Sequence, residues 1–88
     1  MPRYFFHTES HVRTSDDDGL ELPDIHSARV AAARSVAELL RGHADLFWGS
    51  KPWSMTVTDD GGLILFSLEV HGHSSPAIPD QAPSRPQI

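Results

Sequence analysis

Two periodicities of apolar and polar residues divide the chain into strands and a helix. Alternation with a period of two, together with aromatic and β-branched residues, predicts strands near both ends of the folded part. Between them, from Ile25 to about Arg41, apolar residues recur with helical spacing. We therefore predict an α+β fold in which one main helix, following one or two strands and preceding two more, packs on a small antiparallel sheet of three or four strands. The expected strands span residues 3–8, 11–14 (weakly indicated), 53–58 and 63–70.

The predicted helix carries signals at both ends and one residue that departs from its pattern. Asp24 can accept hydrogen bonds from free amides of the first turn, and Gly42 can supply the left-handed residue after the last turn. Arg29 falls inside the apolar arc, where it either lays its stem over the core and pairs with Asp24 or Asp59, which we favour, or presents its guanidinium to an anionic partner. The apolar arc consists of Ile25, Ala28, Ala32, Ala33, Val36, Leu39 and Leu40.

The last predicted strand, residues 63–70, is apolar on both sides. An antiparallel sheet with one face in water normally alternates apolar with polar residues, and this strand does not alternate cleanly. We therefore expect the second sheet face to be covered, either by the connection that follows the helix or by a second copy of the chain. The candidates for this interface are Phe5, Leu65, Trp48 and Trp53.

An acidic segment from Glu9 to Asp24 accounts for the net charge of −5. The contiguous Asp16, Asp17 and Asp18 lack the alternating spacing of an EF-hand loop, so a solvated turn is the expected structure. A basic partner protein or a cation suits this charge, whereas a phosphate backbone needs a basic surface. Direct nucleic-acid binding is therefore not expected.

Length and composition set the domain organisation. The chain has 88 residues and no cysteine, which favours a single domain and excludes disulfides and a thiol nucleophile. We assign residues 1–71 to this domain and expect the proline-rich residues 72–88 to be disordered. No stretch reaches the ~20 apolar residues of a membrane span or the shorter core of a signal peptide. A cytoplasmic protein without membrane contact is the expectation.

Histidines are the candidate metal ligands. His7, His71 and His73 could converge if the first and last predicted strands were suitably placed in the sheet. Because Gly72 loosens the later pair, we favour surface histidines at a frayed strand end and expect no cofactor. The chain also lacks a Gly-x-Ser-x-Gly motif and the lysine of a phosphate loop. We therefore expect no enzymatic activity.

Three motifs follow one another along the chain. They are Pro2-Arg3-Tyr4-Phe5-Phe6-His7, then Asp16-x-x-Gly19-x-Glu21-Leu22-Pro23-Asp24 before the helix, then Val57-Thr58-Asp59-x-x-Gly62. In this order and spacing they resemble a family of short bacterial proteins of unknown function, frequent in soil and plant-associated bacteria, over about residues 2–68. The resemblance implies no activity, cofactor or site residue, and the proline-rich tail departs from the family pattern. The layout of strand, Asp/Gly turn and helix is also loosely similar to antitoxins of the HicB type.

Three functional hypotheses follow. The one we favour is a non-enzymatic interaction or regulatory module that works as a homodimer or with another protein. The alternative is an antitoxin-like protein that binds a basic partner through the acidic segment Glu9–Asp24. A histidine metal-binding protein is the third hypothesis, and elemental analysis of the purified protein would test it.

Overall fold

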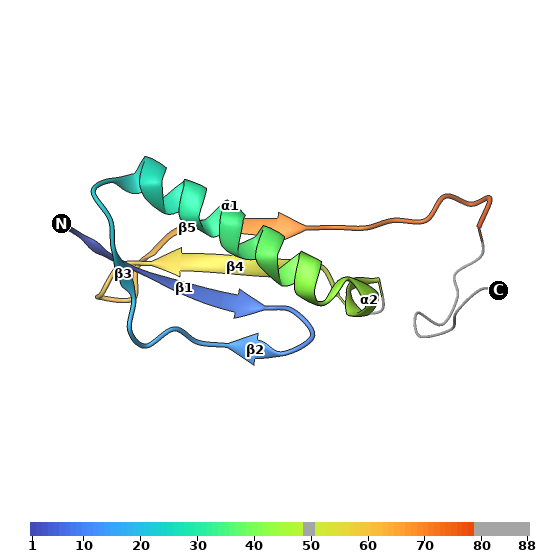
Figure 1. Ribbon diagram of the computed structural model, residues 1–88, viewed down its shortest axis with the longest axis horizontal. Coiled ribbons are helices and arrows are strands. Elements are labelled where there is room, and N and C mark those ends of the chain that lie inside the picture. The colour runs from blue at the N-terminus through green and yellow to red at the C-terminus, as the bar shows by residue number, and fades with distance from the viewer. Residues whose placement is uncertain (49–50, 79–88) are drawn as a thin grey trace.

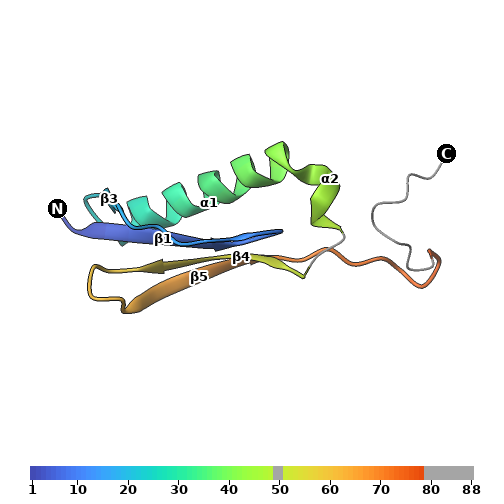
Figure 2. The ribbon, with the colours of Figure 1, turned by 90° about the horizontal axis from the view of Figure 1, so that it is seen from below.

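One long helix lies along one face of an antiparallel sheet in the computed structural model, which describes residues 1–48 and 51–78 (Figures 1 and 2). Turned by 90°, Figure 2 shows both helices on the same side of the sheet and no other described element on the opposite side. The α+β class is confirmed, although the sheet has five strands, two of them only two residues long. The elements are β1 (Arg3–Glu9), β2 (Arg13–Thr14), β3 (Leu20–Glu21), α1 (Ile25–Gly42), α2 (Ala44–Phe47), β4 (Trp53–Thr58) and β5 (Ile64–Val70).

The strand order is β2-β1-β4-β5, and all pairs are antiparallel. The first strand therefore lies inside the sheet, and β5 is an outer strand. The weakly predicted strand at 11–14 forms only at its end, as β2, while the extended residues before Pro23 form β3. Both short strands pair with β1, β2 near its end and β3 near its start.

The hydrophobic core lies between α1 and the sheet. Ala28 and Ala32 are fully buried, and their small side chains let the helix lie close to Val57, which is also fully buried. The predicted apolar arc is wider than the face that the helix actually buries. Ile25, the first residue of α1, is 37% exposed, and Ala33, at the flank of the arc, is also exposed. The buried core consists of Tyr4, Ala28, Ala32, Val36, Met55 and Val57.

A bulge in β5 interrupts the apolar run from which a covered second sheet face was predicted. Val57 pairs with Phe66 but its neighbour Thr58 pairs with Ile64, so Leu65 is an extra residue. Beyond the bulge the strand alternates, with half-buried Phe66, Leu68 and Val70 separated by exposed Ser67 and Glu69. The apolar run before the bulge is 65%, 62% and 36% exposed at Leu63, Ile64 and Leu65, so the described residues of the same chain do not cover it, and the predicted cover by the connection after the helix is not found.

Candidate functional sites on the sheet

The sheet face opposite α1 is mainly polar. The register aligns residues of neighbouring strands across this face, and a shallow groove of about 390 Å³ runs over it. Because hydroxyl and charged side chains are well solvated, this face needs no second layer of protein. The aligned residues are Glu9, Ser54 and Glu69 in one row, His7, Thr56 and Ser67 in the next, and Phe5, Thr58 and Ile64 in the third.

His7 is held at both ring nitrogens. Its Nδ1 accepts a hydrogen bond from the backbone N–H of Asp16 at 3.2 Å, so this nitrogen carries no proton. The neutral ring must therefore be protonated at Nε2, which lies 3.2 Å from Oγ1 of Thr58 and donates to it. In this tautomer His7 cannot take a proton from Thr58, and the pair does not form a base and nucleophile.

The Asp16 carboxylate fills a gap between β2 and β3 at the edge of β1. Oδ2 accepts from the backbone N–H of Phe6 at 3.1 Å, and Oδ1 accepts from those of Asp18 and Gly19, each at 3.1 Å. Burial raises the pKa of Asp16, but the three hydrogen bonds and the nearby His7 together lower it by more. The net pKa therefore lies below its ordinary value. The predicted turn is present, and within it Asp16 is half-buried and also bonds to β1, whereas Asp17 and Asp18 are exposed.

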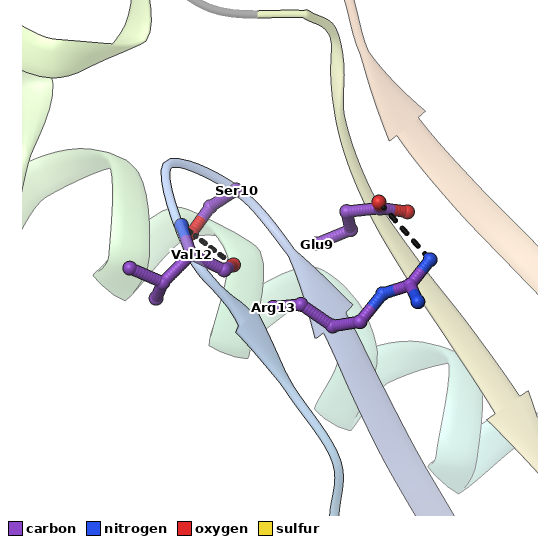
Figure 3. Close-up of polar contacts among 4 residues, drawn as sticks. All are labelled: Glu9, Ser10, Val12 and Arg13. Carbon is purple, nitrogen blue, oxygen red and sulfur yellow. Dashed lines mark hydrogen bonds and ion pairs between the residues drawn. The ribbon is translucent and has the colours of Figure 1, made fainter.

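Other acids of the segment also have partners within the chain. Glu9 forms an ion pair with Arg13 at 3.3 Å across the β1–β2 hairpin, as Figure 3 shows. Its turn is closed by Ser10, whose hydroxyl donates to the backbone carbonyl of Val12 at 3.3 Å (Figure 3). This part of the acidic segment is electrically balanced.

The remaining acids lie around β3 and the start of α1. Glu21 pairs with Arg3 at 3.3 Å, and Asp24 accepts from the backbone N–H of Ser27 at 2.8 Å as the predicted helix cap. Hydrogen bonds from Ser27 lower the pKa of Asp24. Most of the negative charge that suggested a basic partner is thus engaged within the chain.

The candidate metal ligands do not converge. His7 lies on β1, and β4 separates this strand from β5 and from the residues that follow it. His71 pairs with Glu69 at 3.1 Å, and its ring stacks on that of His73 with centroids 6.1 Å apart. Within residues 1–48 and 51–78, no three His, Cys, Asp or Glu side chains are placed to hold a metal ion.

The aromatic candidates separate into buried and exposed residues. Trp53 is only 1% exposed, and its ring packs edge-on against that of Phe47 in α2, with the ring centroids 5.4 Å apart. It is therefore not part of an exposed patch. Phe5 is half-buried beside Gly19. Trp48 is 62% exposed, and its ring leaves no room for a Cβ at Gly72. The segment after α1 packs on the helix side of the sheet and leaves the other face open (Figure 2).

Arg29 extends over the edge of the core, and no carboxylate in the described part of the chain forms an ion pair with it. Its guanidinium carbon lies 5.8 Å from the centre of the Phe66 ring, a cation–π geometry. The stem packing was expected, but the predicted pairing with Asp24 or Asp59 is not found among the described residues.

The free edge of β5 is the feature that sequence reasoning missed. In an antiparallel sheet, successive residues of a strand point their backbone N–H and C=O groups to opposite sides. The bond from Leu22 N–H to the carbonyl of Pro2, at 3.0 Å, shows which residues of β1 point these groups toward β3, and the strand register extends this assignment to β4 and β5. In β5, the backbone N–H and C=O of Phe66 point toward β4, whereas those of Ser67 and Glu69 point away from the sheet. The only sequence signal was the lack of lysine and proline in β5.

The comparisons with known proteins yield one family. The model of a family described as "Domain of unknown function (DUF6894)" matches residues 3–71. No curated protein and no solved structure matches the chain at a significant level. None of the helices in the described residues is sufficiently long and apolar to cross a membrane.

Proposed function

The chain belongs to the DUF6894 family, and because the function of that family is unknown, we propose a function from its surface: a non-enzymatic interaction module that forms a homodimer through the edge of β5. The single observation that carries this proposal is that the outward backbone groups of Ser67 and Glu69 have no partner within residues 1–48 and 51–78. A row of free N–H and C=O groups is a template for another strand. The dimer would join two sheets into one.

The composition of β5 supports pairing. Natural edge strands are commonly protected by lysine, proline or a covering loop, and β5 has one charged residue, Glu69, with neither lysine nor proline. The other side of the sheet is different, because β2, β3 and the Asp16 carboxylate cover the outer edge of β1. The exposed side chains of Ile64 and Leu65 at the start of β5 add apolar surface that a partner would cover.

A two-fold axis at Ser67 gives the register with the best charge arrangement. In an antiparallel pair centred there, Ser67 lies opposite its own copy and Glu69 lies opposite Leu65, so the two glutamates are not paired with each other. Ile64 then lies opposite Val70. The outward backbone groups of Ser67 would form the central hydrogen-bonded pair.

The alternative of a basic partner bound through the acidic segment receives less support. Glu9 and Glu21 are paired with arginines, and Asp16 and Asp24 accept backbone hydrogen bonds.

The proposal of a module without catalysis is supported by the tautomer of His7. Because Nε2 of His7 donates to Thr58, it cannot act as the base that would activate this hydroxyl.

Removal of one outward N–H tests the proposal. In Ser67→Pro the N–H that faces away from β4 is lost, so the monomer keeps its ladder while the edge loses a central donor. Sedimentation should show a dimer for the wild type and for the control Ser67→Ala, and a monomer for Ser67→Pro with an unchanged circular dichroism spectrum. A wild-type monomer at all concentrations, or a Ser67→Pro dimer, would refute the β5 interface.

Single cysteines test the register, because the chain has none of its own. Ser67→Cys places two thiols at the proposed two-fold axis, where Cα atoms about 5.5 Å apart suit a disulfide. Mild oxidation should cross-link this variant. The control Ser54→Cys, on the same sheet face but on the inner strand β4, should remain uncross-linked. Equal cross-linking of the two variants would contradict the register.

A further inference from the structure

A second surface lies on the opposite side of the molecule from β5. A groove of about 500 Å³ separates β3 from the exposed flank of α1. Its walls are chiefly apolar, with Leu20 and Leu22 from the strand side and Val30 and Ala31 from the helix. Leu20 is 49% exposed although it lies beside the core. His26, Ser27 and Arg34 complete the lining.

The strand side of this groove offers free backbone groups. Leu22 N–H is bonded to Pro2, so Leu22 and Leu20 turn their backbone toward β1. By alternation, the N–H and C=O of Glu21 point away from β1. An extended segment could therefore add to this edge through main-chain hydrogen bonds, as in strand-addition recognition.

The helix side supplies a charge without a partner. Arg3, Arg13 and Arg41 pair with carboxylates, and Arg29 lies over an aromatic ring. Among the arginines of residues 1–48 and 51–78, Arg34 alone has no ion pair or ring contact. A free guanidinium at the rim of an apolar groove complements a carboxylate carried by an apolar ligand.

We infer that this groove binds an extended segment of a partner protein in which an apolar side chain stands next to an acidic one. The apolar side chain fills the space between Leu20 and Ala31, the acidic one pairs with Arg34, and the segment's backbone bonds to Glu21. Glu21 does not repel this ligand, since its carboxylate pairs with Arg3. This site is independent of β5, so a β5 dimer would carry two such grooves.

Selection of random octapeptides displayed on phage against the full-length protein tests the site. Enriched peptides should share an apolar residue with Asp or Glu within two positions. Fluorescence polarisation with the synthetic peptides should show about tenfold weaker binding to Ala31→Phe, which fills the groove. The control Ala33→Phe adds the same ring at an exposed helix position outside the groove and should bind like the wild type.

A charge exchange gives a second readout at an exposed residue whose substitution leaves the core intact. Arg34→Glu should weaken the acidic peptides about tenfold, and replacing the acidic residue of the peptide by lysine should restore binding to this variant. The inference is overturned if no peptide is enriched. It is also overturned if the enriched peptides bind Ala31→Phe and Arg34→Glu with the same affinity as the wild type, because the peptides then bind outside the groove. Peptides that dissociate the proposed β5 dimer would likewise overturn it, because they then bind at β5.

Discussion

His7 and Asp16 fasten the acidic loop to the central part of the sheet: the backbone N–H of Asp16 donates to Nδ1 of His7 at 3.2 Å. The side chain of the same aspartate bonds to the backbone of Phe6 at 3.1 Å. Two consecutive residues of β1 are thus bound by one residue of the loop. These two bonds replace strand pairing in the middle of β1, which neither β2 nor β3 reaches.

The tautomer of His7 is the first prediction. Because Nδ1 accepts from Asp16, the neutral imidazole should carry its proton on Nε2, where it donates to Thr58. Nitrogen chemical shifts of the ring, measured by NMR on labelled protein above neutral pH, should show a protonated Nε2 and a bare Nδ1. A ring protonated at Nδ1 would contradict the hydrogen bond to Asp16.

The contribution of Asp16 to stability is the second prediction. Asp16→Ala leaves three backbone N–H groups without their acceptor, those of Phe6, Asp18 and Gly19. The free energy of unfolding should fall by about 1–3 kcal/mol, as measured by urea denaturation. The matched control is Asp17→Ala, which removes an exposed carboxylate from the same turn and should change stability by less than about 0.5 kcal/mol. Equal losses in the two variants would argue against this role for Asp16.

The pH dependence of stability is the third prediction. The pKa of Asp16 is lowered in the folded protein, whereas the unfolded value is about 3.9. Its stabilising effect is therefore fully present above the unfolded pKa and is lost as the pH falls through the folded pKa. The difference in unfolding free energy between wild type and Asp16→Ala should stay constant from about pH 7 to 5 and shrink below about pH 4. A difference that grows on acidification would have the wrong sign.

Two glycines with positive φ give the fourth prediction. Gly19 and Gly62 have φ of 72° and 87°, so alanine is strained at both, by roughly 1–2 kcal/mol. At Gly19 a Cβ would also lie 2.8 Å from Cγ of Arg3 and 2.9 Å from the Phe5 ring, whereas at Gly62 nothing lies within 4 Å. Gly19→Ala should therefore lower the free energy of unfolding by about 1–3 kcal/mol more than Gly62→Ala. Comparable losses would mean that the loop moves away from β1 without cost.

The sequence by itself determined the elements with strong local signals. The spacing of Ala28, Ala32 and Val36 predicted the buried face of α1, and Asp24 is the cap that its side chain predicted. Periodicity and capping depend on residues within a turn or two of one another, so they can be read from the chain directly.

Only the tertiary structure decided the use of the second sheet face. The run from Leu63 to Leu65 reads as a strand with two apolar faces, because a period of two assumes an unbroken register. The extra residue of the bulge depends on the pairing with Val57 and Thr58, which belong to another strand. That pairing leaves the face mainly polar, so the edge of β5, and not the face of the sheet, is the surface proposed for dimer formation.

The role of Asp16 likewise depended on distant partners. Three consecutive aspartates look alike in the sequence, and local reasoning assigned all of them to a solvated turn. Asp16 differs because the gap in the edge of β1 lies beside it, and that gap exists only once β2 and β3 have paired at either end. A hydrogen bond between residues ten apart in the chain is set by folding, which is why the sequence predicted the turn but not the bond from the Asp16 carboxylate to the backbone of Phe6.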